Sequence, residues 1–171
     1  MKVKRICKIG ILSVFIALCA WITVPGPVPF TLQTFAVFLA IMLLGGKDGF
    51  FAIAVYVALG IAGLPVFSGF RSGIGVLLGA TGGYIVGFLI TPFIMLPFEK
   101  RGRAARIISS AAALVTCYIF GTLWYAFVYM SGRKEFDFLS VLLACVVPFI
   151  IPDIIKIALS FVVSERIRDK I

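Results

Sequence analysis

A carboxylate and an ammonium stand three residues apart inside an apolar run near the end of the chain. Asp153 and Lys156 occur in the stretch PFIIPDIIK (148–156), and at positions i and i+3 of a helix their side chains lie on one face. A charge at the centre of a bilayer costs at least ~2.5–3.5 kcal/mol on insertion scales, so such residues usually face a protein interior and serve a function. This pair can hold together on its own and separate around a polar ligand. The alternative is a purely structural ion pair that joins two helices.

The composition predicts a membrane protein. Of the 171 residues, 62% are hydrophobic, which is far above the share in soluble domains, and the length fits one transmembrane domain over residues 1–171. The net charge of +9 comes from short basic clusters between apolar runs. That pattern is typical of membrane topology signals, so we expect contact with a lipid bilayer and no binding of nucleic acid.

Six apolar segments predict an all-α integral membrane protein with six transmembrane helices. Their approximate ranges are 9–24, 30–44, 49–64, 81–98, 107–130 and a last span that begins near 148–152. Residues 138–163 would make a single helix of ~39 Å, longer than the ~30 Å hydrocarbon core. Because Pro148 and Pro152 interrupt this stretch, we expect a short helix at about 138–147 before the last span.

The distribution of basic residues predicts the orientation. If the N-terminus is cytoplasmic, twelve Lys and Arg residues lie in cytoplasmic segments, and only Arg71, Arg133 and Lys134 lie in outer loops. Arg133 and Lys134 belong to a predicted polar turn at 131–137. Positive residues concentrate on the cytoplasmic side of membrane proteins, so we expect both termini in the cytoplasm.

Two irregular apolar loops fall on the predicted outer face, together with the beginning of the last helix. Residues 24–30 carry three prolines, which predict an extended, stiff segment that could act as a lid. Thr31 is a plausible cap of the helix that follows. The glycine-rich connection 64–79 is itself apolar, so we expect it to fold back over the protein. Their convergence with Asp153 and Lys156 predicts a small-molecule site on this face.

The sequence gives little support to catalysis or metal binding. It has no histidine, and neither its acidic residues nor its cysteines occur at metal-ligand spacing, so we expect no metal and no cofactor. The four cysteines are scattered through apolar segments and are typical of packing thiols. No phosphate-binding loop of the form GxxxxGK[ST] is present, so any energy from ATP has to come from partner proteins. An intramembrane enzyme with Asp153 as its base is therefore a weak alternative.

Several stretches resemble the BioY family, the biotin-binding S components of energy-coupling factor (ECF) transporters. The matching stretches are PVPFTLQT (27–34), GLPVF (63–67), LGATGGY (78–84) and the pair Asp153-x-x-Lys156. They cover nearly the whole chain in order and with matching spacing. Ala80 stands where the family usually has proline, and Pro152 stands where it usually has glycine. Both differences bear on affinity more than on the identity of the ligand.

The resemblance implies that the chain binds biotin at the outer face of a prokaryotic plasma membrane. It also implies three partners, a transmembrane coupling (T) protein and two ATP-binding-cassette ATPases. The expected substrate-binding residues are Asp153, Lys156, Tyr84, Gln33, Phe30, Phe67, Thr31, Gly82 and Gly83. Asp153 would accept a ureido N–H, while Lys156 would meet the ureido carbonyl or the carboxylate. An S component for another vitamin and a purely structural membrane subunit are the alternatives.

Two stripes of small residues predict close helix packing. Ala54, Ala58 and Ala62 recur at four-residue spacing, and Ser13 and Ala17 form a second pair at the same spacing. Small side chains let helix backbones approach closely. The alanine stripe would pack within the chain or, equally, contact another membrane subunit, and by resemblance both stripes are plausible contacts for the coupling protein.

Overall fold

The computed structural model describes residues 2–26, 28–130 and 138–168, so the predictions for Pro27 and for the polar turn at 131–137 lie outside the described residues. The long helices are α1 (Lys2–Trp21), α2 (Gln33–Leu44), α3 (Gly46–Ile61), α5 (Gly82–Met95), α6 (Arg103–Met130) and α8 (Val147–Ile167). The short elements are strands β1 (Thr23–Val24) and β2 (Phe30–Thr31), 3₁₀ helices η1 (Ser68–Phe70) and η2 (Leu96–Phe98), and helices α4 (Ile74–Leu78) and α7 (Phe138–Cys145).

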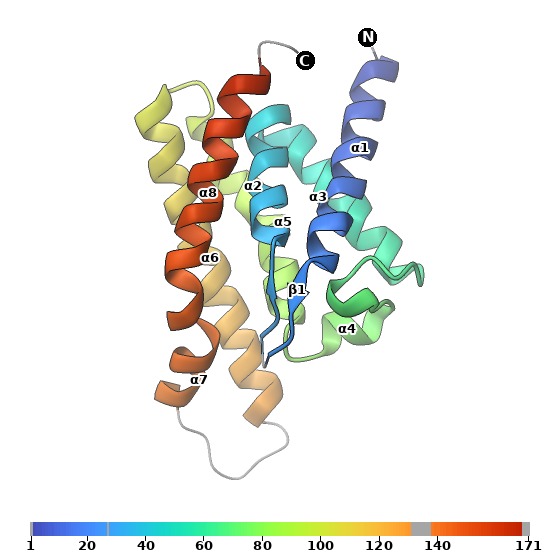
Figure 1. Cartoon of the computed structure of the whole chain (residues 1–171), viewed down its shortest axis with the longest axis vertical. Coiled ribbons are helices and arrows are strands. Elements are labelled where there is room, and N and C mark those ends of the chain that lie inside the picture. Colours follow the sequence, from blue (N-terminus) through green and yellow to red (C-terminus); the bar gives the residue numbers. More distant parts are fainter. Residues whose placement is uncertain (1, 27, 131–137, 169–171) are drawn as a thin grey trace.

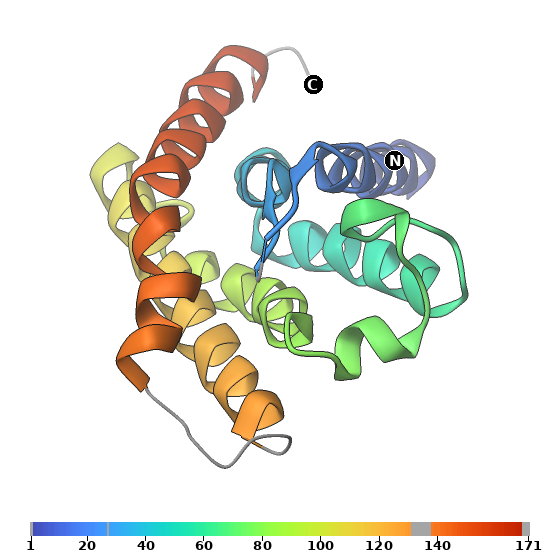
Figure 2. The same cartoon turned by 60° about the horizontal axis from the view of Figure 1, so that its bottom comes forward.

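The long helices form a bundle in which both termini lie at the same end (Figure 1). Helix α5 packs along α6, α8 packs on α2, and α1, α2 and α3 pack against one another. The β-strands, α4 and α7 lie at the opposite end, which Figure 2 brings forward. The irregular segments that the sequence placed on one face are therefore together.

Helix α2 occupies the centre of the bundle. Nine of its twelve residues are buried, among them Val37 and Phe38, which have no exposed surface. Around it, Ile16 of α1 and Ile53 of α3 are also completely buried. A helix that is apolar on every side belongs in the interior, and this one carries Gln33 into the bundle at its first turn.

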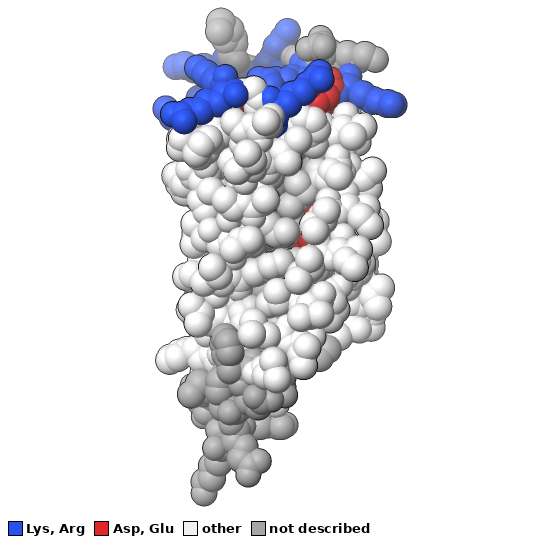
Figure 3. All heavy atoms as spheres, turned by 90° about the vertical axis from the view of Figure 1, so that its left-hand side faces the viewer, with Lys and Arg blue, Asp and Glu red and all other residues white. Residues whose placement is uncertain are grey.

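The surface of the bundle is that of a membrane protein. Residues 103–129 and 141–167 are largely helical stretches of 27 residues each, with mean hydropathies of 1.7 and 2.3, and they are long and apolar enough to cross a bilayer. Shorter apolar helices cover 33–44 and 82–98. Figure 3 shows a broad band almost free of charged residues below a collar of Lys and Arg. The sequence prediction of a largely helical membrane fold is confirmed.

The proline segment forms a β-hairpin and not merely an extended loop. Its strands are antiparallel, with Thr23 opposite Thr31. Because strand pairing takes up the backbone of residues 30–31, the next helix begins at Gln33, and the prediction that it starts near residue 30 is wrong. Leu32 occupies the N-cap position predicted for Thr31, although the Thr31 hydroxyl still accepts a hydrogen bond from the Gln33 N–H at 3.2 Å.

The last long helix begins slightly earlier than the sequence predicted. Helix α7 ends at Cys145, and α8 begins at Val147 with Pro148 in its first turn, where the missing N–H has no helical partner to lose. Pro152 lies inside α8. Asp153 is therefore in the second turn of the helix and faces the bundle at depth.

The glycine-rich connection folds back onto α1 and α3, as predicted. The indole N–H of Trp21 donates to the Pro65 carbonyl at 2.7 Å, and the Trp21 ring stacks on Phe70 with centroids 5.0 Å apart. Gly73 donates its N–H to the Gly60 carbonyl at 2.8 Å and has a φ of 87°, a conformation that favours glycine. These contacts close the connection over the ends of α1 and α3.

The two small-residue stripes have different surroundings. Ser13 is 1% exposed, and its hydroxyl donates to the Ala52 carbonyl of α3 at 2.8 Å. Ala17 is buried with it, so the expectation that this pair contacts a coupling protein is wrong. Ala58 on α3 and Ala62 just after its end are exposed, and they stay candidates for a contact with a partner.

Candidate functional site

Asp153 and Lys156 form a buried ion pair on α8. The Lys156 Nζ lies 2.8 Å from the Asp153 Oδ1, and the two residues are 5% and 3% exposed. The pairing predicted from the i, i+3 spacing is confirmed. Removing either partner would leave the other charge buried without compensation, so each charge depends on the other.

Tyr118 provides a second hydrogen-bond donor to the Asp153 carboxylate. Its hydroxyl donates to the Asp153 Oδ2 at 2.7 Å, which joins the middle of α6 to α8. The sequence reasoning missed this residue. The available signal was a tyrosine hydroxyl in the middle of an apolar span, because a buried hydroxyl needs a hydrogen-bond partner.

Lys156 also contacts the hairpin. Its Nζ lies 3.9 Å from the centre of the Phe30 ring, which is the geometry of a cation–π interaction. Phe30 in turn packs against Phe149 at the start of α8, with ring centroids 6.0 Å apart. The second strand of the hairpin therefore covers the charged pair.

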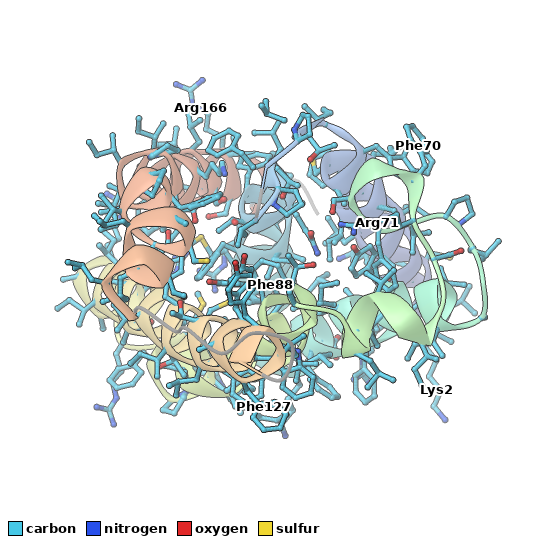
Figure 4. The ribbon with its side chains drawn as sticks, turned by 90° about the horizontal axis from the view of Figure 1, so that it is seen from below. Lys2, Phe70, Arg71, Phe88, Phe127 and Arg166 are labelled. Carbon is cyan, nitrogen blue, oxygen red and sulfur yellow. The ribbon has the colours of Figure 1, made fainter. Side chains whose placement is uncertain are left out.

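These groups line a cavity of about 70 Å³ beneath the hairpin. The described lining residues are Val28, Pro29, Thr31, Gln33, Thr34, Ser68, Thr81, Tyr84, Ile85, Phe88, Leu114, Cys117, Tyr118, Cys145, Phe149, Asp153 and Lys156. Figure 4, seen from the hairpin end, places Phe88 near the centre of the molecule, whereas Lys2, Phe127 and Arg166 lie at the periphery. Apolar walls with a few converging polar groups are typical of small-molecule sites.

Five of the nine predicted site residues line this cavity: Asp153, Lys156, Tyr84, Gln33 and Thr31. They reach it from α8, α5, the start of α2 and the hairpin, which are distant in sequence. A sixth, Phe30, lies against it through the Lys156 ammonium.

The polar ends of Gln33 and Tyr84 have partners within the bundle. The Gln33 Nε2 donates to the Tyr56 hydroxyl at 3.1 Å, and the Tyr84 hydroxyl shares a hydrogen bond with the Thr122 hydroxyl at 3.0 Å. The side-chain carbonyl of Gln33 can accept a hydrogen bond from another donor. These contacts fix the two side chains in the cavity wall.

Phe67, Gly82 and Gly83 are not among the described residues that line the cavity. Phe67 is completely buried, with its ring edge-on to Tyr56 at a centroid distance of 5.6 Å. A Cβ added to Gly83 would lie 2.2 Å from the Trp124 Cβ, and one added to Gly82 would also meet backbone at short range. These three residues occupy packing positions behind the wall.

Arg71 brings a positive charge to the rim of the cavity. Its Nε donates to the Ser68 carbonyl at 3.1 Å and its Nη2 to the Ser68 hydroxyl at 3.4 Å, and Ser68 lines the cavity. The sequence reasoning counted Arg71 only as an outer-loop charge. Its proximity to the site follows from the turn between η1 and α4, which no local pattern reveals.

The whole chain, residues 1–171, matches the model of the BioY family. This chain belongs to the BioY family. It is 39% identical over 168 residues to the biotin transporter BioY of Thermotoga maritima, with 96% of each chain covered. It is 40% identical over 169 residues to the probable biotin transporter BioY of Pyrococcus horikoshii, with 98% of each covered. The resemblance found in the sequence motifs is confirmed.

A solved structure supports the same assignment. The crystal structure of an S-component for biotin from an ECF-type ABC transporter matches with a TM-score of 0.87 over 98% of this chain and 92% of that chain, at 29% identity. The relatives are transporters, and this chain is likewise a transport protein and not an enzyme.

Proposed function

We propose that this BioY chain binds biotin at the outer face of the membrane and serves as the substrate-specific subunit of an ECF transporter. The observation that carries the proposal is the group formed by Asp153, Lys156 and Tyr118, buried in an apolar cavity of a chain that belongs to this family. In this group, one hydrogen-bond acceptor, the Asp153 carboxylate, lies beside two donors, the Lys156 ammonium and the Tyr118 hydroxyl.

The ureido ring of biotin complements this group. It has two N–H donors and one carbonyl acceptor in a single plane. The Asp153 carboxylate can accept the N–H donors, while the Lys156 ammonium and the Tyr118 hydroxyl can turn from the carboxylate to the ureido carbonyl. Such charge-assisted hydrogen bonds are roughly twice as strong as neutral ones, and a dry cavity preserves them.

Binding requires the cavity to widen. Its volume of about 70 Å³ is well below the roughly 300–1,000 Å³ of typical ligand sites. The hairpin is the segment that we expect to move, because Val28 and Pro29 line the cavity and Phe30 lies on the Lys156 ammonium. Val24, at the end of the first strand, is 62% exposed, so this side of the hairpin is not packed into the bundle. We therefore retain the proline segment as the lid of the site.

Arg71 is the group that we propose for the carboxylate of biotin. The guanidinium is exposed at the rim, and its contacts with Ser68 leave further N–H donors for a ligand. With the ureido ring at Asp153, the apolar ring and chain of biotin would run along the wall that includes Tyr84 and Phe88. The carboxylate would then emerge near the hydrated rim.

We place six membrane crossings at α1, α2, α3, α5, α6 and α8, with both termini in the cytoplasm of a prokaryotic cell. Two observations support this multi-pass topology. Both termini lie at one end of the bundle (Figure 1), and the Lys and Arg collar surrounds that end (Figure 3). Positive residues favour the cytoplasmic side, which puts the hairpin and the cavity on the outer side.

Uptake against a gradient requires partners. We propose that a transmembrane coupling protein and two ATP-binding-cassette ATPases supply the energy, because this sequence has no phosphate-binding loop of its own. The similarity to an S-component of an ECF-type ABC transporter supports that assembly. The exposed Ala58 and Ala62 offer one face on which a partner helix can pack closely.

The test is the identity of the bound molecule. Protein purified in detergent is extracted, and the released small molecules are identified by mass spectrometry. We expect biotin at about one molecule per chain, exchangeable with labelled biotin and resistant to an excess of thiamine or riboflavin. Displacement by another vitamin instead of biotin would refute the proposed substrate while leaving the family assignment intact.

A further inference from the structure

A second and larger cavity runs as a groove between α6 and α8. Its volume is about 760 Å³, and no charged side chain is found among the described residues that line it. Along α6 it extends from Ile107 to Leu123, roughly 24 Å at 1.5 Å per residue. It opens to the surface, because the lining residues Ile119 and Ile154 are 56% and 57% exposed. The groove exists because α6 packs on α5 and α8 on α2, with few contacts between α6 and α8.

A basic pocket lies near one end of the groove, where Arg106 precedes the lining residue Ile107. This pocket has a volume of about 480 Å³ and is lined by Glu99, Lys100, Gly102, Arg103, Arg106, Glu165 and Arg168. Its four cations outnumber its two carboxylates. The pocket belongs to the basic collar that surrounds the end of the bundle with the termini (Figure 3).

The groove and the basic pocket are linked through shared side chains. Met42 lines the groove and also a third cavity of about 200 Å³, and Arg106 lines both that third cavity and the basic pocket. The guanidinium of Arg106 lies 5.1 Å from the centre of the Phe161 ring, and Phe161 lines the groove. A molecule with a charged head and an apolar tail could therefore place its head in the basic pocket and its tail in the groove.

The carboxylates of the basic pocket are already engaged. Glu165 accepts hydrogen bonds from Arg103 at 3.0 Å and from Arg106 at 2.7 Å. Glu99 accepts the Gly46 N–H at the start of α3, at 2.9 Å. Within the part of the chain that the structure describes, Lys100 and Arg168 have no ion-pair partner. These two cations are left to meet an anion.

We infer that this is a site for an anionic phospholipid, with the phosphate group in the basic pocket and an acyl chain in the groove. The complementary charge selects an anionic head group, and basic pockets between membrane helices bind such lipids. One leaflet of the bilayer is roughly 15 Å thick, half of the hydrocarbon core, so the groove is long enough for a complete chain. The groove shares Leu114 and Tyr118 with the cavity beneath the hairpin, so a bound acyl chain would pack on the back of the wall that contains Tyr118.

The head-group half of the inference is tested by native mass spectrometry of delipidated protein titrated with dioleoylphosphatidylglycerol or dioleoylphosphatidylcholine. We expect the phosphatidylglycerol to bind preferentially. The double variant Lys100→Gln/Arg168→Gln should weaken its binding about thirtyfold, at ~1 kcal/mol per cation. The matched control, Lys2→Gln/Lys4→Gln, removes the same charge from exposed positions on α1 and should bind it normally. Equal losses in both variants would mean diffuse surface attraction and would overturn the site.

The acyl-chain half is tested with two neighbouring alanines of α6. Ala111 lines the groove, whereas Ala112 is exposed and is not among the described residues that line it. We expect Ala111→Phe to fill the groove and reduce phosphatidylglycerol binding severalfold, with Ala112→Phe unchanged. Retained biotin binding would show that both variants are folded. Unchanged lipid binding in Ala111→Phe overturns the inference and leaves the groove to a partner helix or a second copy of the chain.

Discussion

Replacing Asp153 by asparagine separates a binding role of the charged pair from a structural one. The carboxylate accepts hydrogen bonds from Lys156 at 2.8 Å and from Tyr118 at 2.7 Å. Asparagine has nearly the same shape but leaves the buried ammonium without a counterion. Breaking one partner of a buried pair costs about 3–5 kcal/mol, so we expect the single variant to be clearly destabilised.

The same substitution removes the acceptor proposed for the ureido N–H groups of biotin. A hydrogen bond to a charged group contributes about 1.5–3 kcal/mol, which corresponds to a loss in affinity of roughly ten- to hundredfold. The double variant Asp153→Asn/Lys156→Met removes the uncompensated charge as well. We expect it to recover most of the stability, because replacing a buried ion pair by apolar groups is often neutral. Biotin binding should not recover.

The assay combines thermal unfolding in detergent with equilibrium binding of labelled biotin. Asp48→Asn is the control, since it also breaks an ion pair, with Arg5, but at the exposed end of the bundle. That variant should bind biotin normally. If the double variant at Asp153 and Lys156 bound biotin as tightly as the unaltered protein, the pair would be structural and the proposed site would be refuted.

Four further predictions follow from the structure. A cysteine introduced at Ser72 should react with a membrane-impermeant reagent from outside and one at Arg101 only from inside; the reverse pattern would invert the topology. Replacing the three hairpin prolines with glycine should raise the biotin off-rate more than it lowers the on-rate, because a stiff lid loses less entropy on closing; an unchanged dissociation time course would make the hairpin a connector only. Gly83→Ala should destabilise the protein by about 1–3 kcal/mol in thermal unfolding, since its Cβ would lie 2.2 Å from a Trp124 atom, whereas Gly75→Ala meets nothing within 4 Å and should be tolerated. Arg71→Gln should weaken binding of biotin but not of its uncharged amide; an equal loss for both ligands would exclude a contact between Arg71 and the carboxylate.

The helices and the charged pair could be predicted from the sequence because their signals are local. Apolar runs of membrane length give the helices, and an i, i+3 spacing puts Asp153 and Lys156 on one face whatever surrounds them. The hairpin could not be predicted in this way. Its strands pair Thr23 with Thr31 across the proline segment, and that pairing, rather than the propensity of residues 30–32, sets the start of α2.

The parts of the site that escaped prediction depend on which helices are neighbours. In the sequence, Tyr118 is one of many aromatic residues in apolar segments. Its role is visible only when α6 is placed beside α8, because its hydroxyl then donates to Asp153. In the same way, Ser13 could equally have faced a partner protein, and only the packing of α1 on α3 shows that it donates to Ala52. The motif that contains Gly83 was informative about the family, although this glycine packs behind the cavity wall.

A structure determined with biotin bound tests the central claim most directly. We expect density for the ligand beneath the hairpin, with the ureido ring within hydrogen-bond distance of the Asp153 carboxylate, and with Lys156 turned from Asp153 toward the ureido carbonyl. The Asp153–Lys156 contact of 2.8 Å should lengthen accordingly. Biotin found elsewhere in the bundle, with this contact and the Tyr118 hydrogen bond unchanged, would contradict the account.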